Sequence, residues 1–323
     1  MFAVYASKPN LENPLSSLVI GERPEPEIPE GWERVKVTHA SLNRHDIFTL
    51  MGRSGQLEPI PFPMILGNDG SGVLDDGTEV IIYPVLGSPD WRGDETHDPH
   101  WHVVGELVQG TMADYVVLPR RNLVPRPEGI SLLDGSLLGT AWLTAYRALF
   151  CTSGVKPGGT ILVQGASGGM STALMQLGRA AGIEIWVTSR NEEGHRIAEK
   201  LGARKIFRHG EKLPRKVDAV IDNVGAATWN HSLESVKRGG TVVINGVTTG
   251  FKAETNLLRL FAESISIKGA IMGTLDEMES LISFIIETGI KPEVGTVAPM
   301  TDAKEHIGAM IAGETHGKTI FTR

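Results

Sequence analysis

Short apolar runs separated by prolines and glycines characterise the first 123 residues. Strand-like runs occur at 35–37, 80–83 and 113–118, and five prolines lie between positions 59 and 89. Because proline has no backbone N–H to donate, it does not sit in the middle of a sheet. The pattern therefore predicts an irregular β-barrel in this part of the chain.

From about residue 124 the pattern changes, and buried apolar strands alternate with helices. A strand, a helix and a further strand in succession form a βαβ unit, whose strands run parallel. The expected helices lie at 132–150, 170–181 and 192–201, and the expected strands lie at 160–164, 184–189, 219–222, 241–245 and 264–270. This part is predicted to be an α/β fold with a doubly wound parallel sheet.

The C-terminal part returns to the first domain. Apolar residues at helical spacing (Met278, Leu281, Ile282 and Ile285) predict a helix over 276–287. The run 317–321 predicts a strand that joins the N-terminal barrel. We therefore expect one domain from 1–123 together with 273–323, and a second domain from 124–272.

Composition narrows the class of protein. The 323 residues carry a net charge of −7, and 41% of them are hydrophobic, which is enough for two domains with their own cores. The acidic balance argues against nucleic acid and anionic membranes as partners, and no apolar run reaches the roughly 18 residues that span a bilayer. The single cysteine, Cys151, permits no internal disulfide and is expected to be a buried packing thiol, so we expect a cytoplasmic protein that acts on a small molecule.

The strongest motif is a glycine-rich turn between an expected strand and an expected helix. It reads Gly165-Ala166-Ser167-Gly168-Gly169-Met170-Ser171. Glycines let the backbone approach a pyrophosphate, and the N-terminus of the following helix favours its negative charge. Within a βαβ series the motif predicts a dinucleotide site. Ser171 stands where the fingerprint has its final glycine, and its small side chain predicts a slight shift rather than loss of binding.

The end of the next strand indicates which dinucleotide is bound. An NAD site ends this strand with a carboxylate that accepts hydrogen bonds from the ribose, whereas this chain has Ser189 and Arg190. A guanidinium suits a 2′-phosphate, and Arg208 at the end of the following strand offers a second cation. The alternative is that both arginines are solvated surface residues. We predict NADP(H) as the cofactor.

Several motifs together resemble the medium-chain dehydrogenase/reductase superfamily, and most closely its quinone oxidoreductase and zinc-type alcohol dehydrogenase-like members. They lie at 41–46, 65–72, 144–149, 165–171, 222–225 and 239–243. The resemblance implies a GroES-like catalytic domain and a Rossmann domain, with the nicotinamide in the cleft between them. Asn223, Asn245 and Gly246 are counted among the cofactor-binding residues, since Asn245-Gly246 follows a parallel strand at its carboxyl end. The superfamily also implies a homodimer through the sheet edge at 264–269.

The zinc sites of the superfamily are expected to be absent here. Zinc-containing members bind a catalytic metal with a cysteine, a Gly-His-Glu segment and a second cysteine or aspartate. The resemblance matches these to Asn43, to Asn68 and Asp69, and to the apolar region near Leu138, which are poor zinc ligands. The structural zinc of such relatives needs four cysteines. We therefore predict no bound metal.

A histidine-containing segment takes the place of the structural-zinc lobe. It contains His97, His100 and His102, with Asp98 and Glu106 nearby. These residue types can bind a metal, but a solvated loop is the expected outcome.

Candidate catalytic residues follow the predicted strand that ends near residue 41. Asn43 is expected to donate a hydrogen bond to the substrate oxygen, and His45 to carry a proton near neutral pH. Arg44 replaces a tyrosine of many zinc-free relatives and favours an anionic or strongly polar substrate. The alternatives are that Asn43 caps a turn, that His45 is half-buried and bonded to backbone, and that Arg44 faces solvent. Asp46 is expected to hold its loop through backbone N–H groups.

The leading functional hypothesis is a zinc-independent, NADPH-dependent reductase. Without a metal to polarise a simple carbonyl, hydride is passed instead to a quinone or to the β-carbon of an α,β-unsaturated carbonyl. One alternative is a zinc-type alcohol dehydrogenase with unmatched ligands, and another is a catalytically silent NADPH-binding protein.

Overall fold

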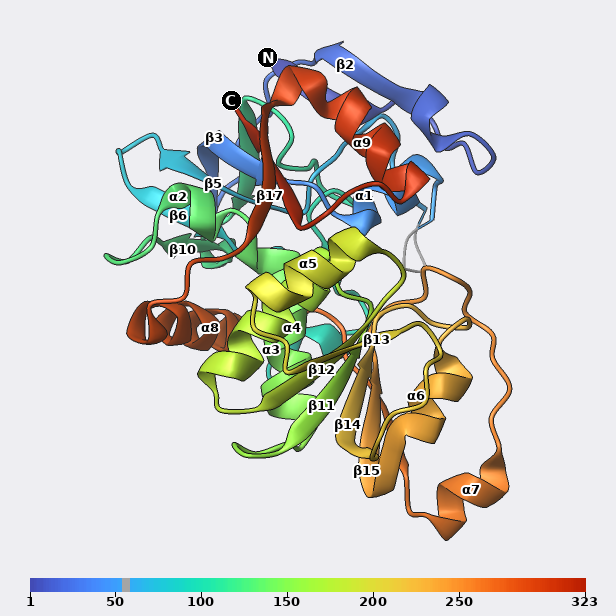
Figure 1. The fold of residues 1–323 in the computed structure, drawn as a ribbon. Helices are drawn as coiled ribbons and strands as arrows, with labels where there is room; N and C mark the ends of the chain where they lie inside the picture. Colours follow the sequence, from blue (N-terminus) through green and yellow to red (C-terminus); the bar gives the residue numbers. More distant parts are fainter. Residues whose placement is uncertain (54–58) are drawn as a thin grey trace. The chain divides into compact units, whose positions relative to one another are not determined.

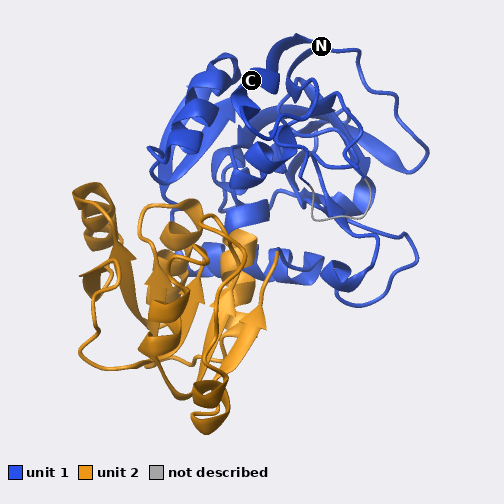
Figure 2. Cartoon of the chain, turned by 90° about the vertical axis from the view of Figure 1, so that its right-hand side faces the viewer, with its two compact units in different colours: residues 1–141, 272–323 blue, residues 142–271 orange. Residues whose placement is uncertain are grey.

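The computed structural model describes residues 1–53 and 59–323. The chain forms two compact units (Figure 2). Unit 1 comprises Met1–Ala141 and Met272–Arg323, and unit 2 comprises Trp142–Ile271. Unit 1 is thus made of two stretches of chain, while unit 2 is continuous. Within the described residues, no helix is both long and apolar enough to cross a membrane.

Unit 1 is built around a curved, mostly antiparallel sheet. Its strands follow the order β10-β6-β5-β3-β18-β17, and β9 pairs with β3; smaller sheets are β2-β1-β4 and β7-β8. The strands are β1 Phe2–Ala6, β2 Leu18–Glu22, β3 Trp32–Ser41, β4 Met64–Ile65, β5 Asp69–Leu74, β6 Glu79–Ile82, β7 Val85–Leu86, β8 His102–Val103, β9 Tyr115–Pro119, β10 Leu123–Pro125, β17 Val294–Pro299 and β18 Lys318–Thr322. Its helices are α1 Arg44–Leu50, α2 Leu132–Gly135, α8 Leu275–Thr288 and α9 Ala303–Ala312, with 3-10 turns at Pro14–Ser17, Glu95–His97, Arg120–Asn122 and Met300–Asp302. The GroES-like architecture expected for this part is confirmed.

The C-terminal strand completes the sheet of unit 1. β18 runs antiparallel to β3, with Ile320 opposite Ser41, and parallel to β17. Ile320 and Phe321 are fully buried, so this strand contributes to the core as well as to the ladder. The predicted return of 317–321 to the N-terminal part is confirmed.

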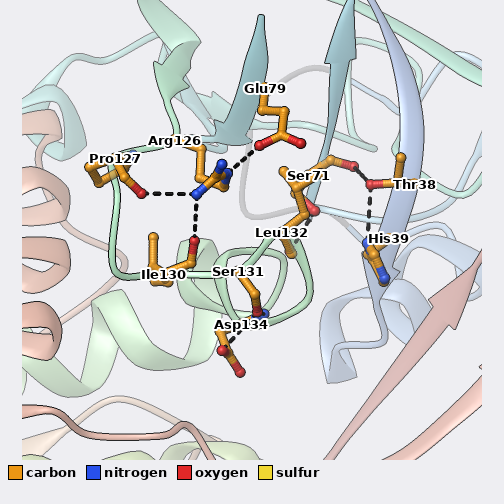
Figure 3. A network of polar contacts seen from close by, with 10 residues as sticks. All are labelled: Thr38, His39, Ser71, Glu79, Arg126, Pro127, Ile130, Ser131, Leu132 and Asp134. Atoms are coloured by element: carbon orange, nitrogen blue, oxygen red, sulfur yellow. Dashed lines mark hydrogen bonds and ion pairs between the residues drawn. The ribbon is translucent and has the colours of Figure 1, made fainter.

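The first stretch of unit 1 extends beyond residue 124, where the sequence changes from short strands to alternating strands and helices. Arg126 forms an ion pair with Glu79 and donates to the carbonyl of Ile130 (2.9 Å), and Ser71 Oγ donates to the carbonyl of Leu132 (2.6 Å) (Figure 3). These bonds fasten the segment before α2, and α2 itself, to strands β5 and β6. For this reason unit 1 runs to Ala141 rather than ending near residue 123.

Unit 2 contains the predicted parallel sheet, in the order β13-β12-β11-β14-β15-β16. All five neighbouring pairs are parallel, which confirms the doubly wound fold. The strands are β11 Thr160–Gln164, β12 Glu184–Ser189, β13 Lys205–Arg208, β14 Val217–Asp222, β15 Val236–Ile244 and β16 Ser266–Gly269, and the helices are α3 Leu143–Tyr146, α4 Gly169–Ala180, α5 Glu192–Lys200, α6 Trp229–Ser235 and α7 Leu257–Ala262.

The two faces of this sheet are covered by different helices (Figure 1). On one face, Leu162 and Trp186 belong to a buried cluster with Leu233 of α6. On the other face, a Cβ added at Gly178 of α4 would lie 2.3 Å from Ile185 Cδ1, so only glycine allows this approach of helix and strand. Successive side chains of a strand point to opposite faces of the sheet. Because both faces are covered, each strand reads as a continuous apolar run in the sequence.

The single helix expected over 132–150 is broken into four pieces. α2 and α3 alternate with wider π-type turns at Leu138–Trp142 and Arg147–Thr152. Gly139 lies in the first of these, where an added Cβ would be 2.9 Å from Pro84 Cδ, so the irregular backbone packs closely on the barrel. Cys151, in the second π-type turn, is exposed. The expectation of a buried thiol is therefore wrong: Cys151 lies near the end of this helical stretch, after the buried residues Arg147, Ala148 and Leu149, and is itself exposed.

Candidate active site

A buried polar cluster lies where three strands of unit 1 meet. In the sheet register, Ser41 at the end of β3 is opposite Asp69 at the start of β5 and opposite Ile320 of β18. Lys318 begins β18, and Asn43 lies two residues after the end of β3. The sheet therefore brings the polar side chains of Ser41 and Asn43 together with Asp69 and with Lys318, which lies far away in the sequence.

Lys318, Asn43 and Asp69 form one continuous hydrogen-bonded chain. The Lys318 ammonium donates to Asn43 Oδ1 (2.7 Å) and to the carbonyl of Leu42 (2.9 Å). Asn43 Nδ2 donates to Asp69 Oδ1 (2.6 Å), which also accepts from Ser41 Oγ (2.6 Å). Lys318 is only 3% exposed. Burial lowers the pKa of Lys318, while the negative charges of nearby Asp69 and Asp46 oppose that shift.

Asp46 supports the loop around this cluster, as expected. Its Oδ2 accepts the backbone N–H of Asn43 (2.8 Å), and its Oδ1 accepts that of Gly67 (2.7 Å). Its side chain is fully buried, and this burial raises the pKa of Asp46 to about 6, although the two backbone hydrogen bonds favour the ionised carboxylate. The expected structural role of Asp46 is confirmed.

His45 lies in a second polar group beside the first. Its Nε2 is 2.8 Å from Glu106 Oε1, and its Nδ1 is 3.2 Å from Asn68 Nδ2. The alternative that His45 bonds only to backbone is wrong, because both ring nitrogens face side chains. Glu106 and Asn68 are almost fully buried, whereas the His45 side chain is 24% exposed.

The three candidate catalytic residues thus have different surroundings. The amide nitrogen of Asn43 donates to Asp69 Oδ1 and to the carbonyl of Ser41 (3.3 Å), so donation to a substrate oxygen requires one of these two bonds to open. Arg44 is exposed on α1, and its Nη1 donates to the carbonyl of Met310 in α9 (3.3 Å). His45 combines a titratable ring with partial exposure. Sequence reasoning missed Lys318 and gave Glu106 no role beside His45, because neither belongs to a local motif.

The residues at the matched zinc positions do not fit a zinc ion. The Asn43 oxygen already accepts from an ammonium, and Asn68 turns its amide nitrogen, not its oxygen, towards His45. Leu138 is apolar and fully buried. Zinc favours thiolate, imidazole and carboxylate ligands, and a neighbouring ammonium opposes a second cation.

The histidine side chains of the segment around residues 97–102 do not converge on a common point. His97 lies 3.9 Å from Asp94, and His102 Nδ1 lies 3.2 Å from the carbonyl of His100. Over residues 1–53 and 59–323 no group of three or more histidine, cysteine, aspartate or glutamate side chains is arranged to hold a metal.

The glycine-rich turn of unit 2 has the geometry of a phosphate-binding loop. Gly165 has a φ of +84°, which favours glycine, and Gly168 is the N-cap of α4 without a side-chain cap. A Cβ added at Gly168 would meet no protein atom within 4 Å. Ser171, at the third glycine position, accepts a hydrogen bond from Asn223 Nδ2 (3.1 Å). The serine is therefore accommodated by a polar contact, and the uncapped helix N-terminus is suited to a pyrophosphate.

Two of the predicted phosphate-binding residues are neighbours in the sheet. Ser189 ends β12 and is paired in register with Arg208, the last residue of β13. Arg190 follows Ser189 directly, and both arginines are exposed. Their backbones therefore place two guanidinium groups at the carboxyl ends of adjacent strands. Glu211 is also close by, since its carboxylate accepts the backbone N–H of Arg208 (2.8 Å).

The loop after β15 contains an amide without a protein partner. Both polar side-chain atoms of Asn245 are buried and form no hydrogen bond. A Cβ added at the next residue, Gly246, would lie 2.3 Å from the carbonyl oxygen of Asn223. The loops that follow β14 and β15 thus pack backbone against backbone, and the buried amide of Asn245 has no hydrogen-bond partner among the described residues. This amide fits a nicotinamide cofactor, as do the turn and the arginines.

Two family comparisons cover most of the chain. Residues 29–128 match the alcohol dehydrogenase GroES-like domain, and residues 169–287 match the zinc-binding dehydrogenase family. The first match lies within unit 1, and the second spans most of unit 2 and part of α8.

Whole-length relatives agree with these matches. The quinone oxidoreductase of Mus musculus is 29% identical over 304 residues, which is 88% of this chain and 86% of that protein. The alcohol dehydrogenase of Geobacillus stearothermophilus is 25% identical over 331 residues, covering 94% and 95%. A crystal structure described as an NAD-dependent alcohol dehydrogenase has a TM-score of 0.91 at 28% identity, with both chains covered completely.

Proposed function

Because this chain belongs to the medium-chain dehydrogenase/reductase superfamily, we propose that it is a zinc-independent, NADPH-dependent reductase of quinones or α,β-unsaturated carbonyls. That it is an oxidoreductase with a nicotinamide cofactor follows from the superfamily. The observation that carries the finer proposal is the buried chain Lys318–Asn43–Asp69. It places an amide, whose oxygen accepts from the Lys318 ammonium, at position 43, where metal-binding members need a ligand.

The proposed substrate class follows from what these residues can do. When bound, the cofactor supplies a hydride. A simple alcohol needs strong polarisation to lose its proton, which zinc provides in other enzymes. A conjugated acceptor spreads the incoming electron pair onto its oxygen, which then needs hydrogen-bond donors or a proton. His45 is proposed as the proton donor, Asn43 as the residue that orders the polar cluster, and Arg44 as a group that favours polar or anionic substrates. The name of the mouse relative supports the quinone class.

The cofactor is proposed to lie on the carboxyl ends of the unit 2 strands. The backbone of the turn 165–170, including Ala166, Ser167 and Met170, is proposed to hold the pyrophosphate at the N-terminus of α4. Ser189, Arg190 and Arg208 are proposed to hold the 2′-phosphate, and Asn223, Asn245 and Gly246 the nicotinamide side. One structural neighbour is described as NAD-dependent, so the nucleotide preference rests on the residues that follow β12.

Replacing Arg190 with alanine is expected to abolish a preference for NADPH. We expect wild type to bind NADPH at least tenfold more tightly than NADH, about 1.4 kcal/mol, because a guanidinium pairs with the 2′-phosphate. Titration followed by nicotinamide fluorescence measures both affinities. Arg238→Ala is the matched control, because Arg238 is an exposed arginine near the amino end of β15. Equal or tighter binding of NADH by wild type would overturn the NADPH assignment.

Assays of the protein before and after treatment with a chelator distinguish the three functional alternatives. Turnover of quinones or enones with NADPH supports the proposal. Tightly bound zinc together with alcohol oxidation that the chelator removes would instead favour a zinc-type alcohol dehydrogenase. Tight NADPH binding without turnover across both substrate classes would favour a silent binding protein.

We also propose a homodimer formed through the edge of the parallel sheet. β16 is the edge strand, and all four of its residues are exposed. Ile267 on this strand and Ile271 just after it are exposed, and the segment before it in the chain exposes four more large apolar side chains, Phe251, Leu257, Leu258 and Phe261. An unpaired apolar edge favours pairing with a second copy. Light scattering is expected to give twice the chain mass for wild type and the single mass for Ile267→Lys, and a monomeric wild type would contradict the proposal.

A further inference from the structure

We propose that Thr188 and Gln164 are positioning residues for the cofactor, which hold the glycine-rich turn of unit 2 in the conformation that receives the pyrophosphate. The inference rests on the proposed placement of the pyrophosphate at this turn and adds the buried side chains that fix its shape. It depends on neither the substrate class nor the preference for NADPH.

One face of the parallel sheet changes from apolar to polar at the same level in three neighbouring strands. The row that belongs to the buried cluster beneath α6, paired in register across β12, β11 and β14, consists of Trp186, Leu162 and Val220. Two positions further along each strand, on the same face, the residues are polar: Thr188, Gln164 and Asp222. All three polar residues are at most 2% exposed. Buried polar side chains cost free energy unless they are hydrogen-bonded, so three in one row indicate a network.

The hydrogen bonds of this row form a chain that begins at the glycine-rich turn. The backbone N–H of Gly165 donates to Thr188 Oγ1 (3.0 Å), and the Thr188 hydroxyl donates to Gln164 Oε1 (2.9 Å). Gln164 Nε2 donates to Ser232 Oγ (2.9 Å), and the Ser232 hydroxyl donates to Asp222 Oδ2 (2.6 Å). The chain therefore runs from a backbone N–H of the turn to a buried carboxylate.

The direction of each hydrogen bond in this chain is determined. A backbone N–H can only donate, so the Thr188 oxygen accepts from Gly165 and its own hydrogen points to Gln164. This fixes Oε1 of Gln164 towards Thr188 and turns Nε2 towards α6, where it also faces His231 Nδ1 at 2.9 Å. A buried chain with one direction is strengthened along its length, because each bond polarises the next.

The far end of the chain fixes the loop after β14. Asp222 Oδ1 accepts the backbone N–H groups of Val224 (2.9 Å) and Gly225 (3.0 Å). Gly225 has a φ of +97°, and Gly165 at the other end of the chain has a φ of +84°. The chain therefore holds the backbone at two places where it leaves neighbouring strands in a conformation that favours glycine.

A branch reaches the loop after β13. His231 Nε2 lies 2.8 Å from the carbonyl oxygen of Glu211, whose carboxylate accepts the backbone N–H of Arg208 (2.8 Å). Gln164 is therefore the junction between the glycine-rich turn, the loop next to Arg208 and the loop that carries Asn223. These are three of the segments proposed to hold the cofactor.

Thr188→Val tests the chain, because it removes the hydroxyl and keeps the shape of the side chain. The N–H of Gly165 then loses its acceptor, and we expect the dissociation constants of NADPH and NADH each to rise about tenfold. Their ratio is expected to stay unchanged, because the pyrophosphate is common to both. Nicotinamide fluorescence measures both constants. Thr188→Ser keeps the hydroxyl and is expected to bind within about threefold of wild type.

Thr160→Val is the matched control. Thr160 is a buried threonine at the amino end of β11, and its Oγ1 accepts a hydrogen bond from Arg215 (2.9 Å). Thr160→Val also loses the hydrogen bond of a buried hydroxyl, but at the opposite end of the strand from the turn. We expect it to lower the free energy of unfolding as Thr188→Val does and to leave both dissociation constants unchanged. Unchanged dissociation constants in Thr188→Val would overturn the positioning role.

Amide hydrogen exchange without cofactor separates this inference from the proposed function. The Gly165 amide is expected to be protected in wild type and in Thr188→Ser, and to exchange at least about tenfold faster in Thr188→Val. Equal protection in all three proteins would overturn the inference even if NADPH is bound. A wild type that prefers NADH, or that reduces neither quinones nor enones, contradicts the proposed function, while a tenfold loss of affinity in Thr188→Val still supports the positioning role.

Ser232→Ala provides a second variant if Thr188→Val does not fold. It breaks the chain between Gln164 and Asp222 and leaves the turn's own contact with Thr188 in place. Faster exchange of the Gly225 amide together with weaker binding of both nucleotides supports the inference. Unchanged exchange and unchanged binding would overturn it.

Discussion

Gly168→Ala is expected to weaken NADPH binding between about ten- and a hundredfold, which is about 1.4 to 2.7 kcal/mol. The space beside Gly168 contains no protein atom within 4 Å, yet it lies at the uncapped N-terminus of α4. We interpret this space as the place of the pyrophosphate, so a methyl group there meets the cofactor rather than the protein. Isothermal titration calorimetry measures the affinity.

Unfolding experiments distinguish this effect from damage to the fold. The φ of Gly168 is −77°, which alanine adopts readily, so the free energy of unfolding is expected to change by less than about 1 kcal/mol. Gly246→Ala provides the contrast, because its Cβ would fall 2.3 Å from the carbonyl oxygen of Asn223 and must also destabilise unit 2. Unchanged NADPH affinity in Gly168→Ala would show that the cofactor does not approach this turn.

Lys318→Met is expected to lower the free energy of unfolding by about 3–5 kcal/mol, the range for leaving a buried charge without its compensating partner. The substitution keeps a long apolar side chain but leaves Asn43 Oδ1 and the carbonyl of Leu42 without their donor. It also removes the positive charge that faces Asp69 and Asp46. Urea unfolding followed by tryptophan fluorescence measures the change.

A double-mutant comparison shows whether charge is the cause. Asp69→Asn removes the opposite charge, so Lys318→Met combined with Asp69→Asn is expected to cost less than the sum of the single changes. Lys216→Met is the control, since its ion pair with Glu263 is exposed to solvent and contributes little to stability. If Lys318→Met were no more damaging than Lys216→Met, the buried network would have no special role in stability.

The parallel sheet could be predicted from sequence because its signals are local. The strands at 160–164 and 184–189 match β11 and β12 residue for residue, since each is a buried apolar run that ends in a polar loop. The stretch 132–150 was harder, because its apolar residues have helical spacing throughout. The backbone widens there around Gly139, where the close contact with Pro84 is a tertiary constraint that periodicity does not reveal.

The two parts of the candidate site, the glycine-rich turn of unit 2 and the polar residues of unit 1, also differ in how well the sequence predicts them. The turn at 165–171 is contiguous, so its glycines and the helix after it identify a dinucleotide site directly. Lys318, by contrast, reaches Asn43 only because β18 pairs with β3, which places residues 275 positions apart within hydrogen-bond distance. Glu106 likewise reaches His45 across 61 positions. No motif spacing in a single sequence encodes these contacts.

The divided course of unit 1 has a consequence for biosynthesis. β3 is among the early strands to leave the ribosome, but β18, its neighbour on one side, is made only after the whole of unit 2. Unit 2 is continuous and can fold as soon as it emerges, whereas the N-terminal stretch must wait with one strand edge open. An open edge invites association with other nascent chains. The order of completion is therefore expected to make unit 1 the part that depends on chaperones during synthesis.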